Sequence, residues 1–417
     1  MSTTVLEKTS TETLAINGGA PAMTQTLPPR QRWGNEELKQ LTAMLEQPSL
    51  FYLTGPQIKL LKERFQKYYP LDYVMPCSSG TAALHIAVEA AGVGPGDEVI
   101  TSAITDMGTV IGVLYQQGVP VFADLKPHTY NLDVEDVRRK ITPKTKAVIA
   151  VHLTGNPCDL DALKVLCDEH DLVLIEDCAQ AWGAMYRGKP IGTVGHIGCW
   201  SLNDFKHIGC GDGGIVASSD KRFGPLLQKF GDKCYDRSGA GGMPETLAPN
   251  YRITEPQAAI AAVQMTKMWE WTEKRAAAGR LLSQELQDIP GIFPHHADER
   301  DRWTCWFYLL RIDPKVLSCD HRTFAQALHA EGVPAGAGYT QVPLYKFPLF
   351  QNHNFFAGRW PVKELDLTEM DYTQVYCPET EAILNTCIKI VVNETTTPEW
   401  IHEAAAAIRK VALHYAG

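Results

Sequence analysis

The sequence has no excess of positive charge, because 39 lysines and arginines are opposed by 48 aspartates and glutamates, a formal net charge of −9. Nucleic-acid binding needs a basic face, and a polybasic membrane contact needs clustered cations. No apolar run approaches the roughly 20 residues of a membrane-spanning helix, and residues 1–19 contain no hydrophobic signal core. We therefore expect no nucleic-acid partner, no membrane partner and a cytoplasmic location.

Paired cysteines are also missing. The eleven cysteines are scattered singly, and none forms the Cys-x-x-Cys spacing that zinc sites often use. We therefore predict no metal site. Because the chain is large and has no signal peptide, its thiols are expected to be reduced and mostly buried.

What the sequence does contain is a regular alternation of short apolar runs and helical patterns. Such alternation predicts an α/β fold with a mostly parallel sheet and helices on both of its faces. Ligands in such sheets bind at the carboxyl ends of the strands. The predicted strands are 97–102, 119–124, 146–153 and 172–177, and the predicted helices are 80–92, 108–118, 133–141 and 159–170.

A chain of 417 residues is long enough for two domains. Residues 254–286 form one long helical pattern, which begins with Thr254 and Pro256 and is suited to linking two domains. We predict an N-terminal arm at 1–35, a large domain at 36–285 that includes this helix, and a small α/β domain at 286–417.

Three local features suggest chemistry. The first is "CSSGTAAL" at 77–84, where a helix is expected to begin at small residues. Free N–H groups and the helix dipole at such a turn bind anions, and glycine lets a phosphate approach the backbone. An ordinary helix cap has the same pattern.

The second feature is the acidic end of the strand at 172–177, Glu176 and Asp177. A carboxylate there can bind a ribose, a metal ion or a cationic ring nitrogen, or it can be a solvated loop acid. The third is Lys206, in the stretch "SLNDFKHIGCGDGG". Most lysines lie on the surface, but a desolvated lysine loses its proton more easily and can then form an imine with an aldehyde.

Together, a phosphate turn, a strand-end acid and an imine-forming lysine indicate pyridoxal 5′-phosphate. The turn would hold the phosphate, Asp177 would keep the pyridine nitrogen protonated, and Lys206 would bind the aldehyde. The combination, in this order within an α/β chain, is far more specific than any one part.

From about residue 14 to near the C-terminus, the sequence resembles the DegT/StrS-type aminotransferases of fold type I. The motifs that carry the resemblance are "SSGTAAL", "GDEVI", "GVPVFAD", "TKAVIAVHLTGNPCD", "IEDCAQAWGA", "SLNDFK…GDGG" and "NYRITEPQAA". The resemblance implies a large domain with a mostly parallel seven-stranded sheet, a smaller C-terminal domain and a PLP-dependent aminotransferase.

The resemblance also implies roles for individual residues. Gly80, Thr81 and Ser201 would bind the cofactor phosphate, and Asp177 would pair with the pyridine nitrogen. Gln180 would lie near the ring face or its phenolic oxygen.

Lys206 would be the Schiff-base lysine of this family. Asn250 would reach the phosphate of the neighbouring subunit's cofactor, which makes the protein a homodimer with composite active sites. Some relatives are dehydratases with histidine in place of the lysine. Here the aligned residue is Lys206 and His207 is one position away, which favours transamination.

One departure concerns the aromatic residue that usually stacks on the cofactor in this family. Asp106 stands at the aligned position, and a carboxylate cannot stack, so it is a candidate substrate or water contact. Arg252, Tyr339 and Tyr345 are further substrate candidates, and Arg252 is equally suited to a structural ion pair.

The resemblance implies a ping-pong transfer from L-glutamate or L-glutamine to a keto-sugar or an inosose-like keto-cyclitol. Two other functions stay open at this point. One is a PLP-dependent lyase or dehydratase on the same scaffold, and the other is a non-catalytic relative that keeps the cofactor as a ligand.

Overall fold

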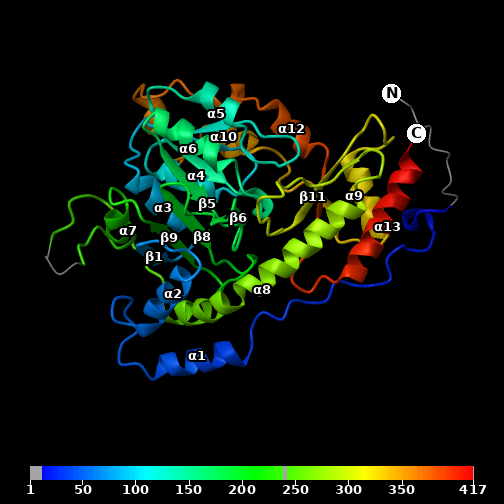
Figure 1. The fold of residues 1–417 in the computed structure, drawn as a ribbon. Helices are drawn as coiled ribbons and strands as arrows, with labels where there is room; N and C mark the ends of the chain where they lie inside the picture. The colour runs from blue at the N-terminus through cyan, green and yellow to red at the C-terminus, as the bar shows by residue number, and fades with distance from the viewer. Residues whose placement is uncertain (1–11, 238–241, 417) are drawn as a thin grey trace.

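The computed structural model describes residues 12–237 and 242–416. Its two sheets are joined by helix α8 (Glu255–Glu285), which runs from the large sheet to a smaller lobe (Figure 1). Thr254 and Gln257 form a capping box at the start of α8, and proline stands in its first turn. The long helix predicted from the sequence is confirmed.

The large sheet has seven strands in the order β1-β9-β8-β5-β4-β2-β3. Strands β8, β5, β4, β2 and β3 are parallel, and β9 is antiparallel to both of its neighbours. The predicted fold class is therefore confirmed. The strands are β1 (Tyr73–Cys77), β2 (Glu98–Ser102), β3 (Val119–Ala123), β4 (Thr145–Val151), β5 (Val173–Asp177), β8 (Ile197–Ser201) and β9 (Gly214–Ser218).

This topology brings distant parts of the chain to one edge of the sheet. Because β9 is antiparallel to β1 and β8, those two strands end where β9 begins, and Gly214 pairs with both Cys77 and Ser201. The parallel strand β5 ends at Asp177 at the same edge. The carboxyl edge of a sheet is where α/β folds bind ligands.

Helices cover the sheet and bury it. Helix α3 packs on β1, β9 and β8, and it is buried along almost its whole length because its residues are mainly alanine and other apolar types. Helix α2 packs on α8. The helices of this part are α1 (Asn35–Leu45), α2 (Pro56–Gln66), α3 (Gly80–Ala90), α4 (Gly108–Tyr115), α5 (Val134–Lys140), α6 (Leu160–Glu169) and α7 (Gly224–Gly231).

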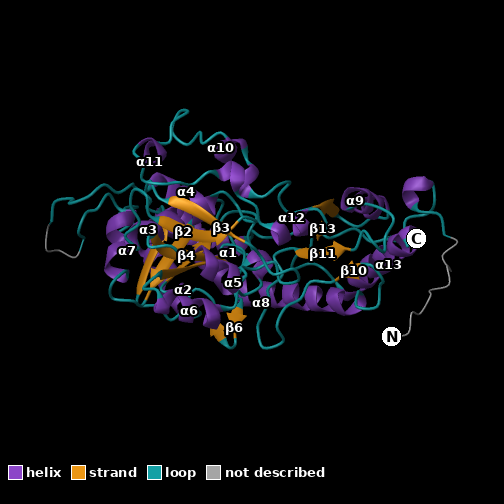
Figure 2. Ribbon diagram, turned by 90° about the horizontal axis from the view of Figure 1, so that it is seen from above, coloured by secondary structure: helices purple, strands orange, loops and turns teal. Residues whose placement is uncertain are grey.

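The smaller lobe is built on a four-stranded antiparallel sheet in the order β10-β11-β13-β12. It lies beyond the large sheet along α8 (Figure 2). Its elements are β10 (Ile292–Phe293), β11 (Tyr308–Ile312), β12 (Ala335–Ala337), β13 (Cys387–Ile390), α9 (His321–Ala330), α12 (Pro378–Leu384) and α13 (Pro398–Tyr415).

The N-terminal arm is anchored to this smaller lobe. Leu14 and Met23 are part of its apolar core. The buried carboxylate of Glu331 accepts the backbone N–H groups of Ala15 and Ala22 and pairs with the ammonium of Lys410. The arm is thus held by hydrogen bonds as well as by apolar contacts.

One segment beyond residue 285 packs on the large sheet instead. Tyr345, Phe350 and Tyr372 enclose Phe122 of β3, and the Tyr372 hydroxyl donates to the Pro120 carbonyl. Helices α10 (Pro348–Gln351) and α11 (Pro361–Glu364) therefore lie beside α4 (Figure 2). The domain boundary predicted at 285/286 stays a prediction. Residues 344–377 follow that boundary in the sequence, yet they pack on the large sheet.

The eleven cysteines are all free thiols, and ten of them are buried. Their expected state as mostly buried, unpaired thiols is confirmed. Among residues 12–237 and 242–416, no helix combines the length and the apolar character that crossing a membrane requires.

Candidate active site

A cavity of about 350 Å³ lies at the carboxyl edge of the large sheet. It brings together predicted site residues that are up to 259 positions apart in the sequence, from Gly80 to Tyr339. Its lining contains Gly80, Thr81, Asp106, Asp177, Ser201, Lys206 and Tyr339.

The start of α3 forms one wall of this cavity. Ser79 caps the helix by accepting the N–H of Ala82 at 3.0 Å, so the cap turns the chain directly into the cavity. A Cβ atom on Gly80 would lie 2.7 Å from Cβ of Ser201, so only glycine lets the helix start and strand β8 come this close. The turn and the Ser201 hydroxyl together form a cradle that suits a phosphate.

The two strand-end acids point to opposite sides of the sheet, because successive residues of a strand alternate. Asp177 lines the cavity. Glu176 points away, and its two oxygens accept hydrogen bonds from the backbone N–H groups of Gly192, Val194 and Gly195 and from the Nε2–H of His152. Asp177 is thus the acid of the cavity, and Glu176 is the acid that holds the loop at 192–195.

We expect Glu176→Gln to lower the stability of the protein. The amide places an NH₂ group where backbone donors need an acceptor, and hydrogen bonds to a charged group contribute about 1.5–3 kcal/mol each. A loss of about 3 kcal/mol or more is expected, measured as a lower melting temperature. A melting temperature equal to that of the wild type would contradict the role of Glu176 in holding the loop.

Asp177 is buried and is held by two neutral donors. One carboxylate oxygen accepts the N–H of Ala179 at 3.1 Å, and the other accepts the Thr109 hydroxyl at 2.8 Å. Burial raises the pKa of the Asp177 carboxyl, while these two donors partly oppose the rise. A cationic group beside this carboxylate would stabilise its charged form, so the site fits a protonated ring nitrogen.

Lys206 extends into the same cavity from the loop after β8. Its side chain is half-buried, and the ammonium lies 4.0 Å from the ring centre of Trp306. Burial lowers the pKa of Lys206, and the charges of Asp177 and Asp106 oppose that change. A larger fraction of Lys206 is therefore in the neutral amine form, which imine formation needs, than for an exposed lysine.

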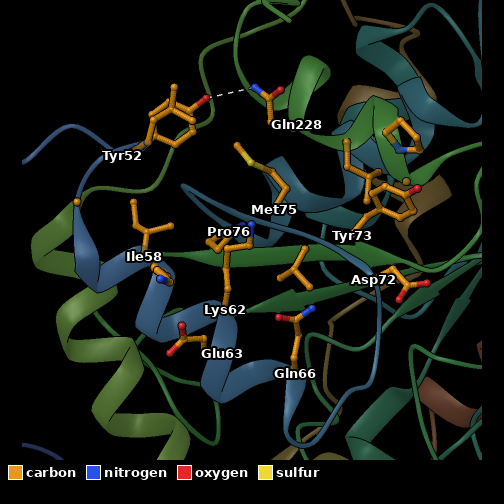
Figure 3. Close-up of a pocket in the computed structure, with 17 residues that line it drawn as sticks. Tyr52, Ile58, Lys62, Glu63, Gln66, Asp72, Tyr73, Met75, Pro76 and Gln228 are labelled. Carbon is orange, nitrogen blue, oxygen red and sulfur yellow. Dashed lines mark hydrogen bonds between the residues drawn. The ribbon is translucent and has the colours of Figure 1, made fainter. Parts of the chain in front are cut away.

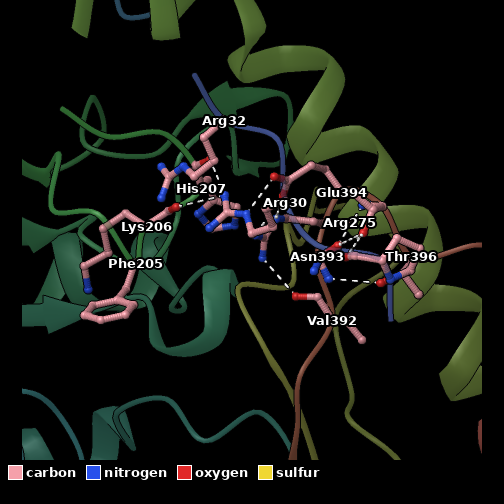
Figure 4. A network of polar contacts seen from close by, with 12 residues as sticks. Arg30, Arg32, Phe205, Lys206, His207, Arg275, Val392, Asn393, Glu394 and Thr396 are labelled. Atoms are coloured by element: carbon pink, nitrogen blue, oxygen red, sulfur yellow. Dashed lines mark hydrogen bonds and ion pairs between the residues drawn. The ribbon is translucent and has the colours of Figure 1, made fainter. Parts of the chain in front are cut away.

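The backbone behind Lys206 is held by the N-terminal arm (Figure 4). The Arg30 guanidinium donates to the carbonyls of Lys206 and His207 and pairs with Glu394 at 2.7 Å. Glu394 also pairs with Arg275 of α8 at 2.9 Å. The arm, the linking helix and the smaller lobe therefore meet directly behind the reactive lysine.

Tyr339 lines another side of the cavity, and Gln180 contacts it from outside the lining. The Gln180 amide donates to the Tyr339 hydroxyl at 3.3 Å and accepts the N–H of Thr154 at 3.0 Å. The Tyr339 ring stacks on Phe307, with 4.9 Å between the ring centres. Tyr339 lines the cavity, which is the position that its predicted contact with a substrate requires.

Four predicted residues lie outside the lining of this cavity: Gln180, Asn250, Arg252 and Tyr345. Tyr345 is fully buried and its hydroxyl donates to Glu381, so the structure does not support the predicted hydroxyl contact with substrate. Its ring fills the core beside Phe122 because the segment packs on the large sheet. Arg252 pairs with Asp232 at 3.3 Å, which is the structural alternative weighed for it.

Asn250 is exposed, and its side-chain oxygen accepts a hydrogen bond from Arg252 at 2.8 Å. It is not among the lining residues of the cavity in its own subunit. Its predicted contact with a neighbouring subunit stays a prediction.

Several lining residues were not predicted from the sequence, and two of them contact predicted residues. Thr109 supports Asp177, and Trp306 contacts Lys206. Asp106, predicted in place of a stacking aromatic, is exposed on the cavity side, and one of its oxygens accepts the N–H of Gly108 at 2.8 Å. The aromatic lining of the cavity consists of Phe205 and of Trp306 and Tyr339, which come from beyond α8.

A larger groove of about 590 Å³ lies elsewhere, between α2, β1 and the start of α7 (Figure 3). None of the predicted site residues lines it. Its lining includes Lys62, whose pKa is lowered by burial, but no buried acid comparable to Asp177 accompanies that lysine. The predicted site residues therefore favour the smaller cavity as the candidate active site.

One group of side chains has the composition of a metal site. His152, Glu176 and Cys178 bring one ligand atom each within 4.8 Å of one another. The Nδ1 atom of His152 accepts the N–H of Cys158, so its Nε2–H donates to Glu176, and the Glu176 oxygens are already occupied by backbone donors. These contacts give the group a structural role, and we assign no metal to it.

The model of the DegT/DnrJ/EryC1/StrS aminotransferase family matches residues 31–409. The chain belongs to this family. A relative from Micromonospora echinospora, named putative L-glutamine:3-amino-2,3-dideoxy-scyllo-inosose aminotransferase, is 33% identical over 84% of this chain and 84% of its own. A pleiotropic regulatory protein from Geobacillus stearothermophilus is 35% identical over 75% of this chain and 82% of its own.

The DegT-family fold is also found among solved structures. An aminotransferase from Psychrobacter cryohalolentis matches 94% of this chain and 100% of its own, with a TM-score of 0.81 and 26% identity. The protein is thus an aminotransferase of the DegT/DnrJ/EryC1/StrS family, as the sequence motifs predicted. Members of this family depend on pyridoxal 5′-phosphate.

Proposed function

We propose that this aminotransferase moves an amino group from L-glutamate or L-glutamine to a keto-sugar or a keto-cyclitol by a ping-pong mechanism. The observation that carries the proposal is the single cavity shared by Lys206, Asp177 and the start of α3. The acceptor class is supported by the name of the Micromonospora relative, which specifies an amino-inosose.

The residues present fit the cofactor. The cradle of Gly80, Thr81 and Ser201 suits its phosphate, and the buried Asp177 carboxylate suits a protonated pyridine nitrogen. Tyr339 borders the remaining space, and the Gln180 amide donates to its hydroxyl. When bound, pyridoxal 5′-phosphate supplies an aldehyde and an electron-accepting ring.

Lys206 has two tasks in this proposal. It holds the cofactor covalently at rest, and its free amine then takes a proton from the α-carbon of the amino donor and returns one. Burial and the neighbouring Trp306 ring keep the amine away from bulk water. The carbonyl contacts from Arg30 fix the backbone from which this side chain extends.

We also propose a homodimer in which Asn250 of one subunit completes the cavity of the other. The exposed Phe205, whose side chain is 76% accessible, lines the cavity mouth and would be covered by a second subunit. A cytoplasmic location stays a prediction from the sequence.

Attachment of the cofactor should depend on pH. The neutral amine of Lys206 is the attacking form, so the rate at which apoenzyme binds pyridoxal 5′-phosphate covalently should rise as the pH rises through its pKa. Asp106→Asn removes a charge that raises this pKa, so the midpoint should move to lower pH. Stopped-flow absorbance measures the rate, and an unmoved or raised midpoint would contradict the electrostatic account.

A single-turnover experiment tests the function itself. Holoenzyme mixed with L-glutamate or L-glutamine should convert from the pyridoxal to the pyridoxamine form and release one 2-oxo acid per site. A keto-sugar or inosose should then restore the pyridoxal form and leave aminated. A lyase releases no stoichiometric 2-oxo acid, and a non-catalytic relative shows no conversion, so either result would refute the proposal.

A further inference from the structure

The charges that line the Lys206 cavity are mainly negative. Among the described lining residues, the acids are Asp106, Asp177 and Asp212, and Lys206 is the sole cation. The proposed function uses Lys206 to hold the cofactor and Asp177 to pair with its ring. Asp106 and Asp212 then remain without an assigned role, and neither forms an ion pair with another of those lining residues.

Asp106 is well placed to contact a substrate. It follows β2 at the carboxyl edge of the sheet, and the N–H of Gly108 fixes its Oδ1 atom at 2.8 Å. In the described part of the chain, its Oδ2 atom has no hydrogen-bond donor, and the side chain is exposed on the cavity side. A Cβ atom on Gly108 would lie 2.6 Å from Oγ1 of Thr81 and 3.0 Å from Oδ1 of Asp106. The carboxylate is thus held close to the cofactor cradle.

Asp212 adds a second negative charge at the mouth of the cavity. It is exposed, and its Oδ1 accepts the side-chain amide of Asn203 at 3.0 Å. A carboxylate only accepts hydrogen bonds, so it favours hydroxyl or ammonium groups and disfavours phosphate oxygens. The cavity therefore suits a ligand rich in hydrogen-bond donors.

We propose that the amino acceptor is a free polyhydroxy ketone without a phosphate or nucleotide, and that Asp106 accepts a hydrogen bond from a hydroxyl or amino group on its ring. The inference rests on the proposed transamination and narrows its acceptor class. Asp106 and Asp212 act against phosphorylated and nucleotide-linked keto-sugars through like charge. Asp106 is the residue that determines this specificity.

The test compares three ketones on the pyridoxamine form of the full-length enzyme at one ionic strength. They are a neutral inosose, an amine-bearing inosose and a nucleoside-diphosphate-linked keto-hexose. The wild type should show a kcat/KM at least about tenfold higher for one of the two inososes than for the nucleotide-linked ketone. Preference for the nucleotide-linked ketone, or no reaction with either inosose, would overturn the inference.

Asp106→Asn should lower kcat/KM for the preferred inosose by about 10- to 100-fold, the effect of one hydrogen bond to a charged group, and should narrow the ratio to the nucleotide-linked ketone. The matched control is Asp204→Asn, which removes an exposed acid of the same loop as Lys206 that is not among the cavity-lining residues and pairs with Arg32 at 3.5 Å. The role of Asp106 would be contradicted if Asp106→Asn left the ratio of the two kcat/KM values unchanged. It would also be contradicted if Asp204→Asn changed that ratio equally.

Two further measurements separate this inference from the proposed function. Calorimetric titration of the holoenzyme with uridine diphosphate should show no binding at micromolar concentrations. Micromolar binding would overturn the inference, and this measurement does not depend on catalytic activity. The donor half-reaction with L-glutamate or L-glutamine does not involve the ketone. Failure of the donor half-reaction refutes the proposed function. A normal half-reaction combined with a preference for the nucleotide-linked ketone refutes only the inferred acceptor class.

Discussion

Lys206→Ala should abolish transamination, with kcat reduced by at least about 10⁴-fold. The variant loses both the covalent attachment of the cofactor and the amine that moves the donor proton, and general acid–base catalysis alone contributes about 10²–10⁴-fold. The visible absorbance of the cofactor bound to lysine should disappear as well. Steady-state assays and absorbance spectra of the reconstituted protein measure both effects.

A matched control for this variant is Lys62→Ala. Lys62 also has a pKa lowered by burial, but it lies in the groove between α2 and β1, which none of the predicted site residues lines. Lys62→Ala should keep wild-type turnover and the wild-type spectrum. Loss of activity in Lys62→Ala with retention in Lys206→Ala would reverse the assignment of the two lysines.

Asp177→Asn should lower kcat by about 10²–10³-fold while the protein stays folded, because a preorganised charge facing the reacting group is removed. The asparagine oxygen can still accept the N–H of Ala179, and its NH₂ group can donate to the Thr109 hydroxyl, which can act as an acceptor, so the local structure has little reason to change. The cofactor should also bind more weakly. Turnover, cofactor affinity and melting temperature are measured on the same preparation.

Glu176→Gln is the natural comparison, since the two acids are adjacent on one strand. Asp177→Asn should lose activity with a near-normal melting temperature, whereas Glu176→Gln should lose stability and keep more of its activity. The opposite pattern, with catalysis lost in Glu176→Gln and stability lost in Asp177→Asn, would contradict the assignment of Asp177 to the cavity and of Glu176 to the 192–195 loop.

The sequence predicted the large sheet well because its parallel strands are continuous apolar runs between amphipathic helices. Strands β4 and β5 and helix α3 were found within a few residues of their observed bounds. Strand β1 was not predicted. It contains Pro76, which is tolerated because β1 is at the edge of the sheet and pairs only with β9.

The part of the site that lies on the strand ends was also predictable. Asp177 follows directly from where the predicted strand at 172–177 stops, the α3 turn follows from its small residues, and Ser201 was implied by the family resemblance. Thr109 and Trp306 were not, because their roles depend on contacts between elements that are distant in the sequence. The contact of Arg30 with the Lys206 carbonyl spans 176 positions, and no local pattern announces it.

Tyr345 shows how a loop with aromatic residues can mislead. Tyr345 was a predicted substrate contact, yet the aromatic rings of its segment pack around Phe122 of β3, an edge strand of the sheet. Burial of apolar area stabilises that arrangement, and periodicity within the segment does not predict it. Tyr339, six residues earlier, reaches the cavity.

Reduction of the wild-type holoenzyme with borohydride, followed by peptide mapping, tests the central claim most directly. The hydride fixes the cofactor to the lysine that holds it, and mass spectrometry identifies that residue. The account predicts one modified peptide with the cofactor on Lys206 and no modification of Lys62. A cofactor fixed to any other lysine, with Lys206 unmodified, would contradict it.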